Sequence, residues 1–421
     1  MPQSKPMTLP APPLGLVPSG GRAADRRVVM VMVAVQCTAA LGFWAVMTHL
    51  VAHLRHDVGL LAGTAGTILA VRVGVQYALL LPVGTVTDML GPARAGAIAC
   101  GVRAAGFTLL GFADGPAELV AAAVLLGAGG ALFHPAAQSL LAGLAPGRRA
   151  RGFAAYVITG QAAAVAGPPL GLLVLSLGSG APAGFTLLAT LAGGAWAVAS
   201  VLFLLLLGHR PPRSNGGGAG ARLRELAANV RAVVADRAFL AFALATAPTT
   251  LLADHTTVVP LKGFTSGAAT LFFCVLAATA AAVQPWVAAR GRGERPWTLR
   301  CGLLLAGAAY LTLALLDGAR SPLGWLLAAA VLAGAGNGLL QASVFQRVAR
   351  LAAPERFGSY FGVLSFVSGM FAAAGGMAVG RLFDFGGTGA TAALLGLAAL
   401  GAATAALCGG RRYPYWYDPR S

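Results

Sequence analysis

The stretch GTVTDMLGPARAG, residues 84–96, separates two long apolar runs and has the composition of a tight polar turn between membrane-spanning helices. Four of its residues stand at regular intervals: Gly84, Asp88, Gly91 and Arg94. A small residue, an acid one helical turn later and a glycine that can adopt positive φ suit a short connection between two helices. An ordinary helical hairpin with a solvated Asp88 and Arg94 would fit as well, so the rest of the chain has to decide.

The composition of the chain excludes an ordinary soluble domain. Of its 421 residues, 57% are hydrophobic and only 10% are charged, whereas soluble domains contain about 25% charged residues. The apolar residues form runs of roughly 20, which is the length an α-helix needs to cross about 30 Å of hydrocarbon, and they lack the ten-residue alternation of barrel strands. The sequence therefore predicts an all-α membrane protein.

The apolar runs fall into two groups of six, which predicts twelve transmembrane helices in two six-helix halves. The expected helices are 28–52, 60–83, 93–113, 116–140, 152–177 and 183–207, followed by 238–261, 267–289, 299–316, 322–344, 359–381 and 389–409. The predicted organisation is a tail (1–27), an N-terminal half (28–207), a basic linker (208–237), a C-terminal half (238–409) and a second tail (410–421). Apolar residues at helical spacing in the linker predict a helix on the membrane surface.

The distribution of positive charge predicts the orientation. With the N-terminus inside, 24 of the 30 Lys and Arg residues fall in cytoplasmic loops and tails, four fall outside and two lie within helices. This bias follows the positive-inside rule. It places both termini and the linker in the cytoplasm of a multi-pass protein of the cell membrane, expected to be a bacterial inner membrane. The formal charge of +17 does not indicate a nucleic-acid partner, because the arginines are spread over short loops.

Several function classes are disfavoured by what the sequence lacks. The five cysteines lie in apolar runs without C-x-x-C spacing, so we expect packing residues, no metal site and no cofactor. No H-E-x-x-H, G-x-S-x-G or P-loop pattern occurs in the sequence, so neither an enzyme nor a directly ATP-driven pump is expected. A receptor without transport activity, or a membrane enzyme of another type, is the alternative from a different class.

The spacing of Gly84, Asp88, Gly91 and Arg94 resembles the loop 2–3 signature G-x-x-x-D-x-x-G-x-x-R of the major facilitator superfamily. Two six-helix halves joined by a basic linker extend this resemblance to the whole chain. The resemblance implies the major facilitator fold, and it implies that these four residues form a cytoplasmic latch that holds the two halves together.

A second signature of the same family lies in the predicted fifth helix. Gly167, Pro168 and Gly171 match its G-P-x-x-G core, which is typical of the antiporters. Small residues let helices approach closely, and proline removes a backbone hydrogen bond so that the helix can bend. A kinked packing helix without a transport role is the other interpretation.

Two further regions bear on the branch of the family. Residues 357–387, with Asp384 near their end, resemble the eleventh helix of drug-efflux members, which implies the drug:proton antiporter branch. The family pattern also places an arginine four residues before Gly127, where this chain has Ala123. Since that arginine is linked to proton coupling in relatives, its replacement puts coupling by the usual route in doubt.

Two arginines lie deep in predicted helices. Arg72 and Arg103 are about ten residues from either helix end, or roughly 15 Å from both interfaces, which is too far for full snorkelling. An ionised group at the bilayer centre costs about 2.5–3.5 kcal/mol on insertion scales, so both are candidates for function. They could instead be structural groups that bond to helix carbonyls. Neither has an obvious carboxylate partner in its own half.

Other polar residues in the spans occur in pairs four residues apart, and such pairs share one face of a helix. The pairs are Arg72 with Gln76, His134 with Gln138, Thr250 with Asp254, and Asn337 with Gln341. They predict four helices that line a shared aqueous pathway, although hydrogen bonding between helices would explain any single pair.

Apart from Glu118 at the start of 116–140, Asp254 is the one carboxylate that the predicted limits place inside a span. Together with His255 it could bind a proton on one side of the membrane and release it on the other. It could instead form a gate with Arg72 or Arg103, or lie among solvated headgroups if the helix ends earlier.

These features predict a secondary active transporter, with proton-coupled efflux of small organic or drug-like molecules by alternating access as the leading function. The expected partners are a small-molecule substrate, protons and the lipid bilayer, and the protein is expected to be a monomer. An importer or facilitator of a nutrient or organic anion is the alternative, favoured by the uncompensated Arg72 and Arg103.

Overall fold

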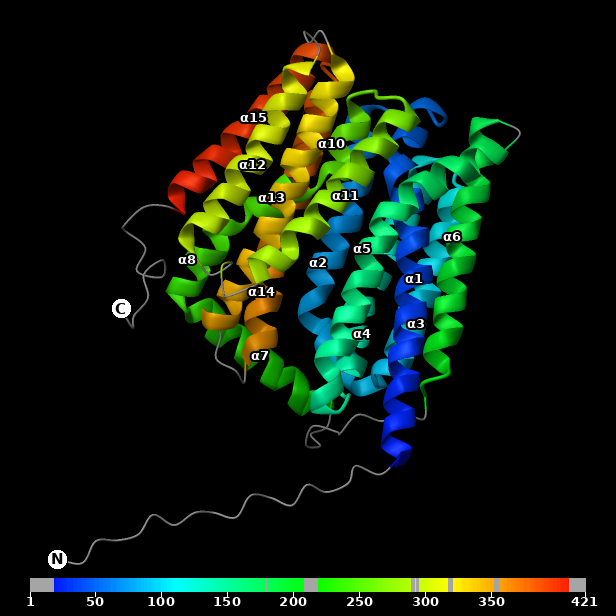
Figure 1. The fold of residues 1–421 in the computed structure, drawn as a ribbon, viewed down its shortest axis with the longest axis vertical. Coiled ribbons are helices and arrows are strands. Elements are labelled where there is room, and N and C mark those ends of the chain that lie inside the picture. Colours follow the sequence, from blue (N-terminus) through cyan, green and yellow to red (C-terminus); the bar gives the residue numbers. More distant parts are fainter. Residues whose placement is uncertain are drawn as a thin grey trace, which may run out of the picture.

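The structure is a computed structural model that describes residues 19–178, 180–207, 219–288, 292, 295–316, 321–351 and 356–408. Its described residues form helices and connecting turns, without a β-strand (Figure 1). The expected terminal tails lie largely or wholly outside these residues, as does the first part of the linker.

The N-terminal half consists of six long helices. They are α1 (Ser19–His56), α2 (Ala62–Leu90), α3 (Pro92–Gly111), α4 (Pro116–Ala142), α5 (Pro146–Leu177) and α6 (Ala181–Leu204). Proline begins α3, α4 and α5, where its missing N–H is one that the first turn could not use. Gly91 joins α2 to α3 with φ 80°, a conformation that favours glycine.

The linker contributes α7 (Ala219–Ala235), and the C-terminal half follows it. The helices of this half are α8 (Arg237–Thr246), α9 (Pro248–Ala253), α10 (His255–Leu261), α11 (Ser266–Ala288), α12 (Pro296–Ala314), α13 (Pro322–Leu351), α14 (Phe357–Phe383) and α15 (Gly386–Leu407). The Asp236 carboxylate accepts hydrogen bonds from the backbone N–H groups of Ala238 and Phe239 and so caps α8 directly after the linker.

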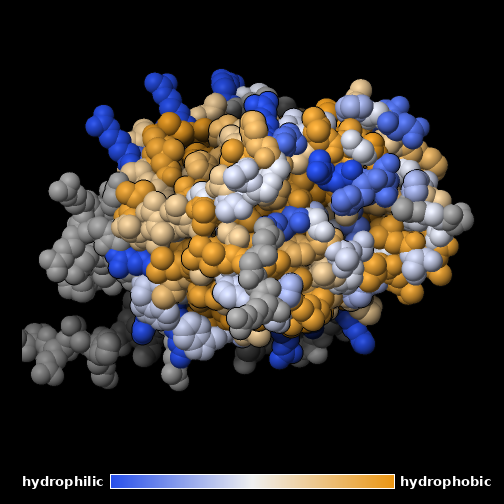
Figure 2. Space-filling view, turned by 90° about the horizontal axis from the view of Figure 1, so that it is seen from above, coloured by the Kyte–Doolittle hydropathy of each residue, from blue (hydrophilic) through white to orange (hydrophobic). Residues whose placement is uncertain are grey.

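Ten of the described helices are long and apolar enough to cross a membrane. The helix α3, which carries Arg94 and Arg103, and the interrupted segment α8–α10 make the other two crossings of a twelve-span protein. Hydrophobic side chains cover much of the bundle end in Figure 2, with hydrophilic residues scattered between them. The prediction of an all-α membrane protein with two six-helix halves is confirmed.

The prediction of one continuous helix over 238–261 is wrong, because the seventh span is broken twice. Pro248 begins α9, and Asp254 separates α9 from α10 with φ −87° and ψ 88°. The Asp254 carboxylate accepts hydrogen bonds from the backbone N–H and the hydroxyl of Thr256 and caps α10. An acid at this position therefore ends one helix and starts the next.

The carbonyl groups released by this break are bonded inside the C-terminal half. The Tyr310 hydroxyl donates to the carbonyl oxygens of Leu252 (3.1 Å) and Asp254 (3.4 Å), and the Asn337 amide donates to that of Ala253 (3.3 Å). Irregular backbone at membrane depth requires such partners, because hydrocarbon offers none. Asn337, expected on the transport pathway, thus stabilises the broken helix.

The two halves meet where α2 packs along α14 and where α5 packs against α11; α2 and α14 lie side by side in the centre of Figure 1. A Cβ at Gly66 would lie 3.1 Å from the Gly376 carbonyl oxygen and from the Gly380 Cα. Further along the same pair, the Tyr77 ring covers Gly369. Glycine therefore sets the separation of α2 and α14 at several levels.

The glycines of the predicted antiporter signature pack α5 against α1. A Cβ at Gly171 would lie 2.4 Å from the Ala45 carbonyl oxygen, and one at Gly167 would lie 2.6 Å from the Trp44 Cβ. The Pro168 carbonyl oxygen is 3.1 Å from His49 Nε2 on α1. The signature residues lie at a tight helix contact.

We predict that Gly171→Ala destabilises the protein by about 1–3 kcal/mol, because backbone must move to admit the methyl group. The matched control is Gly194→Ala on α6, where a Cβ meets nothing within 4 Å, so this variant should be neutral or more stable. The measurement is the midpoint of thermal unfolding in detergent. Equal midpoints for the two variants would contradict the packing described for α1 and α5.

Candidate transport pathway between the two halves

A cluster of cationic and aromatic side chains lies inside the N-terminal half. The guanidinium carbon of Arg103 on α3 is 4.6 Å from the ring centroid of Trp196 and 5.2 Å from that of Phe43. The guanidinium carbon of Arg72 on α2 is 5.9 Å from the same Phe43 ring. Aromatic faces attract cations, so Phe43 lies between two favourable contacts that offset part of the cost of buried charge.

Glycines on α4 make room for Arg103. A Cβ at Gly130 would lie 2.4 Å from Arg103 Nη2 and 2.7 Å from the Gln76 side-chain oxygen, and one at Gly129 would lie 2.7 Å from Arg103 Cγ. Arg103 Nε donates a hydrogen bond to the Leu126 carbonyl oxygen on α4 (3.2 Å). The guanidinium of α3 is thus held against α4, the helix on which the family pattern has an arginine and this chain has Ala123.

Arg72 and Asp254 bring the two halves into electrostatic contact. Asp254, at the break of the seventh span, attracts the guanidinium of Arg72 on α2. Among the described residues the two side chains form no ion pair within 4.0 Å, and Arg72 Nε is buried without a hydrogen-bond partner. Their interaction therefore acts over more than 4.0 Å. The role of Asp254 stays a prediction.

A chain of glutamine side chains crosses between the halves. The Gln161 amide on α5 donates to the Gln284 oxygen on α11 (2.9 Å), and the Gln284 amide donates to the Gln341 oxygen on α13 (2.9 Å). Near it, the Cys274 thiol on α11 donates to the Val165 carbonyl oxygen on α5 (3.3 Å). Gln341, expected on the pathway, is exposed and is one of these hydrogen-bonded glutamines.

Of the other expected pathway residues, some are exposed and others are partly or fully buried. His134 and Gln138 are exposed on α4, one and two turns beyond Gly130. Thr250 is half-buried one turn before Asp254. His255 is buried in the C-terminal half with its ring stacked on that of Tyr310 at 5.0 Å, so it does not join the interface cluster.

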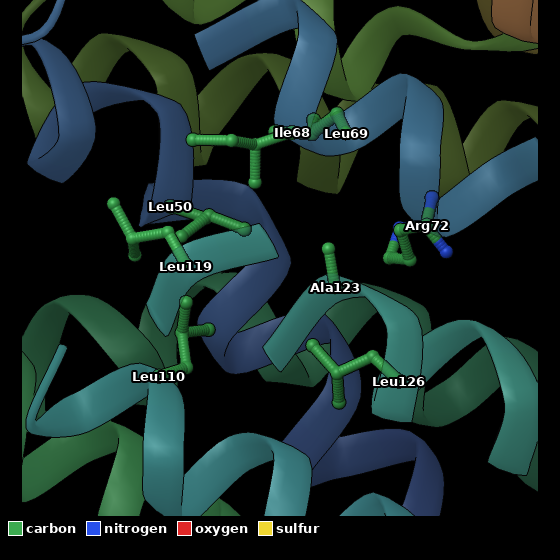
Figure 3. Close-up of a pocket in the computed structure, with 8 residues that line it drawn as sticks. All are labelled: Leu50, Ile68, Leu69, Arg72, Leu110, Leu119, Ala123 and Leu126. Carbon is green, nitrogen blue, oxygen red and sulfur yellow. The ribbon is translucent and has the colours of Figure 1, made fainter. Parts of the chain in front are cut away.

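A small apolar pocket lies next to Arg72, between α1, α2, α3 and α4. Its lining is Leu50, Ile68, Leu69, Arg72, Leu110, Leu119, Ala123 and Leu126, and Figure 3 shows Arg72 at its edge. Arg72 is its single charged lining group. A cargo site needs several converging polar groups, so this pocket is a gap in the helix packing and not the transport site.

The arrangement of two six-helix halves around a polar interface is that of a known transporter fold, and the family comparison agrees with it. The family model described as Major Facilitator Superfamily matches residues 32–369. The chain belongs to this superfamily. It is a multi-pass membrane transporter.

Curated relatives of this transporter include proteins with and without a described role. An uncharacterized MFS-type transporter of Mycobacterium tuberculosis (strain ATCC 25618 / H37Rv) is 25% identical over 360 residues, which are 82% of this chain and 83% of the relative. The multidrug resistance protein MdtH of Aeromonas hydrophila is 31% identical over 170 residues, which are 40% of this chain and 41% of the relative.

Solved structures share the fold at low sequence identity. A POT family transporter in complex with 5-aminolevulinic acid superposes with a TM-score of 0.73 and 14% identity, covering 90% of this chain and 94% of that one. The nucleoside transporter NupG gives a TM-score of 0.71 and 13% identity, with coverages of 91% and 98%. These likenesses concern the fold alone.

The structure describes the expected latch only in part. Gly84 and Asp88 lie in the last turns of α2, but the side chain of Asp88 is outside what the structure describes. Gly91 forms the turn with positive φ, and Arg94 is exposed in the first turn of α3. The latch function of these residues stays a prediction.

A second contact joins the halves at the bundle end opposite α7. The Asp384 carboxylate at the end of α14 accepts two hydrogen bonds from the Gly63 N–H in the first turn of α2, at 3.0 and 3.1 Å. Leu61, which precedes α2, offers no side-chain cap of its own. The N-terminus of an α-helix has unpaired N–H groups and partial positive charge, so a carboxylate there is stabilising. The C-terminal half thereby caps a helix of the N-terminal half.

Sequence reasoning missed several members of the interface. Gln161 and Gln284 stand alone in apolar helices, so a search for pairs four residues apart passes over them. A single glutamine inside an apolar span would have been a sufficient signal. The role of Tyr310 as donor to the broken helix has no local signal, since its acceptors are 56 and 58 residues away.

We predict that Asp384→Asn loosens this contact, since a lost charged cap costs about 1 kcal/mol, or roughly a fivefold shift in an equilibrium. The reporter is Ala62→Cys, a position only 1% exposed beside the contact. In whole cells, an impermeant maleimide should label it about fivefold faster when Asp384→Asn is added. Ser266→Cys, exposed at the same end, should label rapidly in both backgrounds. An unlabelled Ser266→Cys would show that this end faces the cytoplasm, and an unchanged rate at Ala62→Cys would contradict the capping role.

Proposed function

We propose that this transporter exports small organic, amphipathic molecules by alternating access, driven by inward proton flow, from a bacterial inner membrane. The observation that carries the proposal is the position of Asp254 at the break of the seventh span, within electrostatic range of Arg72 in the other half. The similarity to a multidrug resistance protein over part of the chain, and the glycine and proline signature at the contact of α5 with α1, support the antiporter class.

In this mechanism Asp254 is the group that carries the proton. When ionised it attracts Arg72 and draws the two halves together at the middle of the membrane. A proton from outside neutralises it and removes that attraction, so the halves can part. Release of the proton on the cytoplasmic side restores the attraction and completes the cycle. The nearby hydroxyl of Thr256 holds the carboxylate in place throughout.

The proposed orientation places α7, the latch residues and both termini in the cytoplasm and the Asp384 contact outside. The latch then closes the inner face, as the Asp384 contact closes the outer face. Alternating access requires that only one of these two contacts, the latch or the Asp384 contact, is fully formed at a time.

Import or facilitated movement of an organic anion is the second candidate function. It is favoured by the charge of the described interface cluster, in which two guanidinium groups, those of Arg72 and Arg103, stand against one carboxylate, that of Asp254. Direction and proton coupling separate this candidate from the first.

We predict that Asp254→Asn abolishes proton-driven transport in inverted vesicles but preserves substrate exchange without a gradient, because the amide cannot carry a proton. The assay imposes an inward-acid gradient and follows uptake of a panel of dyes, antibiotics and simple organic anions. Asp114→Asn, at an exposed loop position, is the matched control and should resemble the unmodified protein. Loss of exchange as well would identify Asp254 as a gate. Normal coupling in Asp254→Asn would end the proposed role of this residue.

We also predict that Asp88→Asn reduces the transport rate about tenfold while substrate affinity changes less than twofold, because a latch biases the conformational equilibrium and does not touch cargo. Transport is measured in the same vesicles and affinity on purified protein. A normally expressed Asp88→Asn variant with an unchanged rate would rule out the latch.

A further inference from the structure

The cluster around Arg103 is rich in hydrogen-bond donors that have no acceptor. Three donors, Arg72 Nε, the Tyr156 hydroxyl and Trp196 Nε1, are buried without a hydrogen-bond partner, against one unpaired acceptor, Gln76 Oε1 beside Gly130. Tyr156 lies within electrostatic range of Arg103, and the Trp196 ring lies against its guanidinium. Buried polar groups are normally paired, so a group of unpaired donors at one place points to a missing acceptor.

The charge of the cluster is also unbalanced. Arg72 and Arg103 are close enough to repel each other, and in the described part of the chain Asp254 acts on Arg72, while no carboxylate acts on Arg103. That carboxylate is already bonded to the N–H and hydroxyl of Thr256. Arg103, only 5% exposed, has a single hydrogen bond from its guanidinium, the one from Nε to Leu126. One buried and one half-buried cation therefore face one partly engaged anion, although burial of charge requires compensation.

The cluster connects to an open surface along one face of α4. Gly130, His134 and Gln138 are spaced four residues apart and so lie along one side of that helix. Gly130 touches Arg103 and Gln76, whereas His134 and Gln138 are exposed. The face runs from the arginines toward the end of the bundle that carries α7, and the opposite end is closed by the Asp384 contact. An anion could therefore reach the arginines from the α7 end.

We infer that the N-terminal half contains the binding site for the acidic group of the cargo. The transported substrates are then organic acids. Arg72 and Arg103 bind the carboxylate or another oxyanion through charge-assisted hydrogen bonds, and Tyr156 and Trp196 supply further donors. Gln76 borders the space beside the two guanidinium groups, and Gly130 leaves that space open because it has no side chain. This inference rests on the proposed transport function, but it does not depend on proton coupling or on the direction of transport.

The test measures binding to purified protein in nanodiscs by equilibrium dialysis. The probes are organic acids from acetate to 2-naphthoate, each paired with its methyl ester, together with 2-naphthylmethylammonium as a cation on the same ring. We expect at least one acid to bind at least tenfold more tightly than its ester and the cation, and inorganic sulfate to compete with it.

Arg72→Gln and Arg103→Gln should each weaken binding of that acid about 10- to 100-fold, the range for hydrogen bonds to charged groups, with ester binding unchanged. Arg224→Gln on the exposed part of α7 is the matched control and should change neither. Because Arg103 is buried and its replacement can disturb folding, Arg72→Gln and the sulfate competition on the unmodified protein each test the inference independently.

The inference is overturned if no acid in the panel binds, if acids and esters bind equally, or if the cation is preferred. Proton-driven export of neutral or cationic molecules with no acid preference would leave the proposed function intact and reject the anion site. Acid binding that depends on both arginines, without proton-driven transport, would support the anion site and reject the proposed function.

Discussion

The close approach of α2 and α14 is the contact on which the two-half architecture depends. Glycine faces glycine near the end opposite α7, where Gly66 meets Gly376 and Gly380, and the Tyr77 ring covers Gly369 further along. Helices in lipid gain no hydrophobic stabilisation from each other, so close packing of small residues is a main source of their association. Where glycine faces glycine, this contact has no interlocking side chains to break. It can therefore act as the surface on which one half rocks against the other.

Polar groups at membrane depth are supported in two different ways. In the C-terminal half the break at Asp254 releases backbone carbonyls, and Tyr310 and Asn337 bond to them, so this irregular backbone is satisfied within its own half. In the N-terminal half, aromatic rings and glycines accommodate the arginines but supply few acceptors. The carbonyl groups of the broken seventh span are thus bonded within their own half, while the arginine cluster of the N-terminal half keeps unused donors. That asymmetry is why the cargo site is proposed in the N-terminal half.

The length and spacing of the apolar runs predicted the number of spans and the division into halves, because the bilayer requires about 20 apolar residues per crossing. The depth of Arg72 and Arg103 followed from the same limits. The broken seventh span could not be predicted, since Pro248 and Asp254 are also compatible with a kinked continuous helix. Whether such a break is stable depends on donors distant in sequence, above all Tyr310 and Asn337. The position of Arg103 against α4 likewise depends on how α3 packs, which its own sequence does not specify.

The cap that Asp384 places on α2 has a consequence for the transporter at rest. It exists only while the ends opposite α7 touch, and when they separate both the first turn of α2 and the carboxylate must find water instead. Without cargo, the contact therefore favours the conformation that is closed at that end. In the orientation proposed above, a carrier with such a default leaves no open route to the outside while idle. Arg72 and Arg103 then stay shielded from the external medium, and small inorganic anions there cannot use the empty protein as a leak.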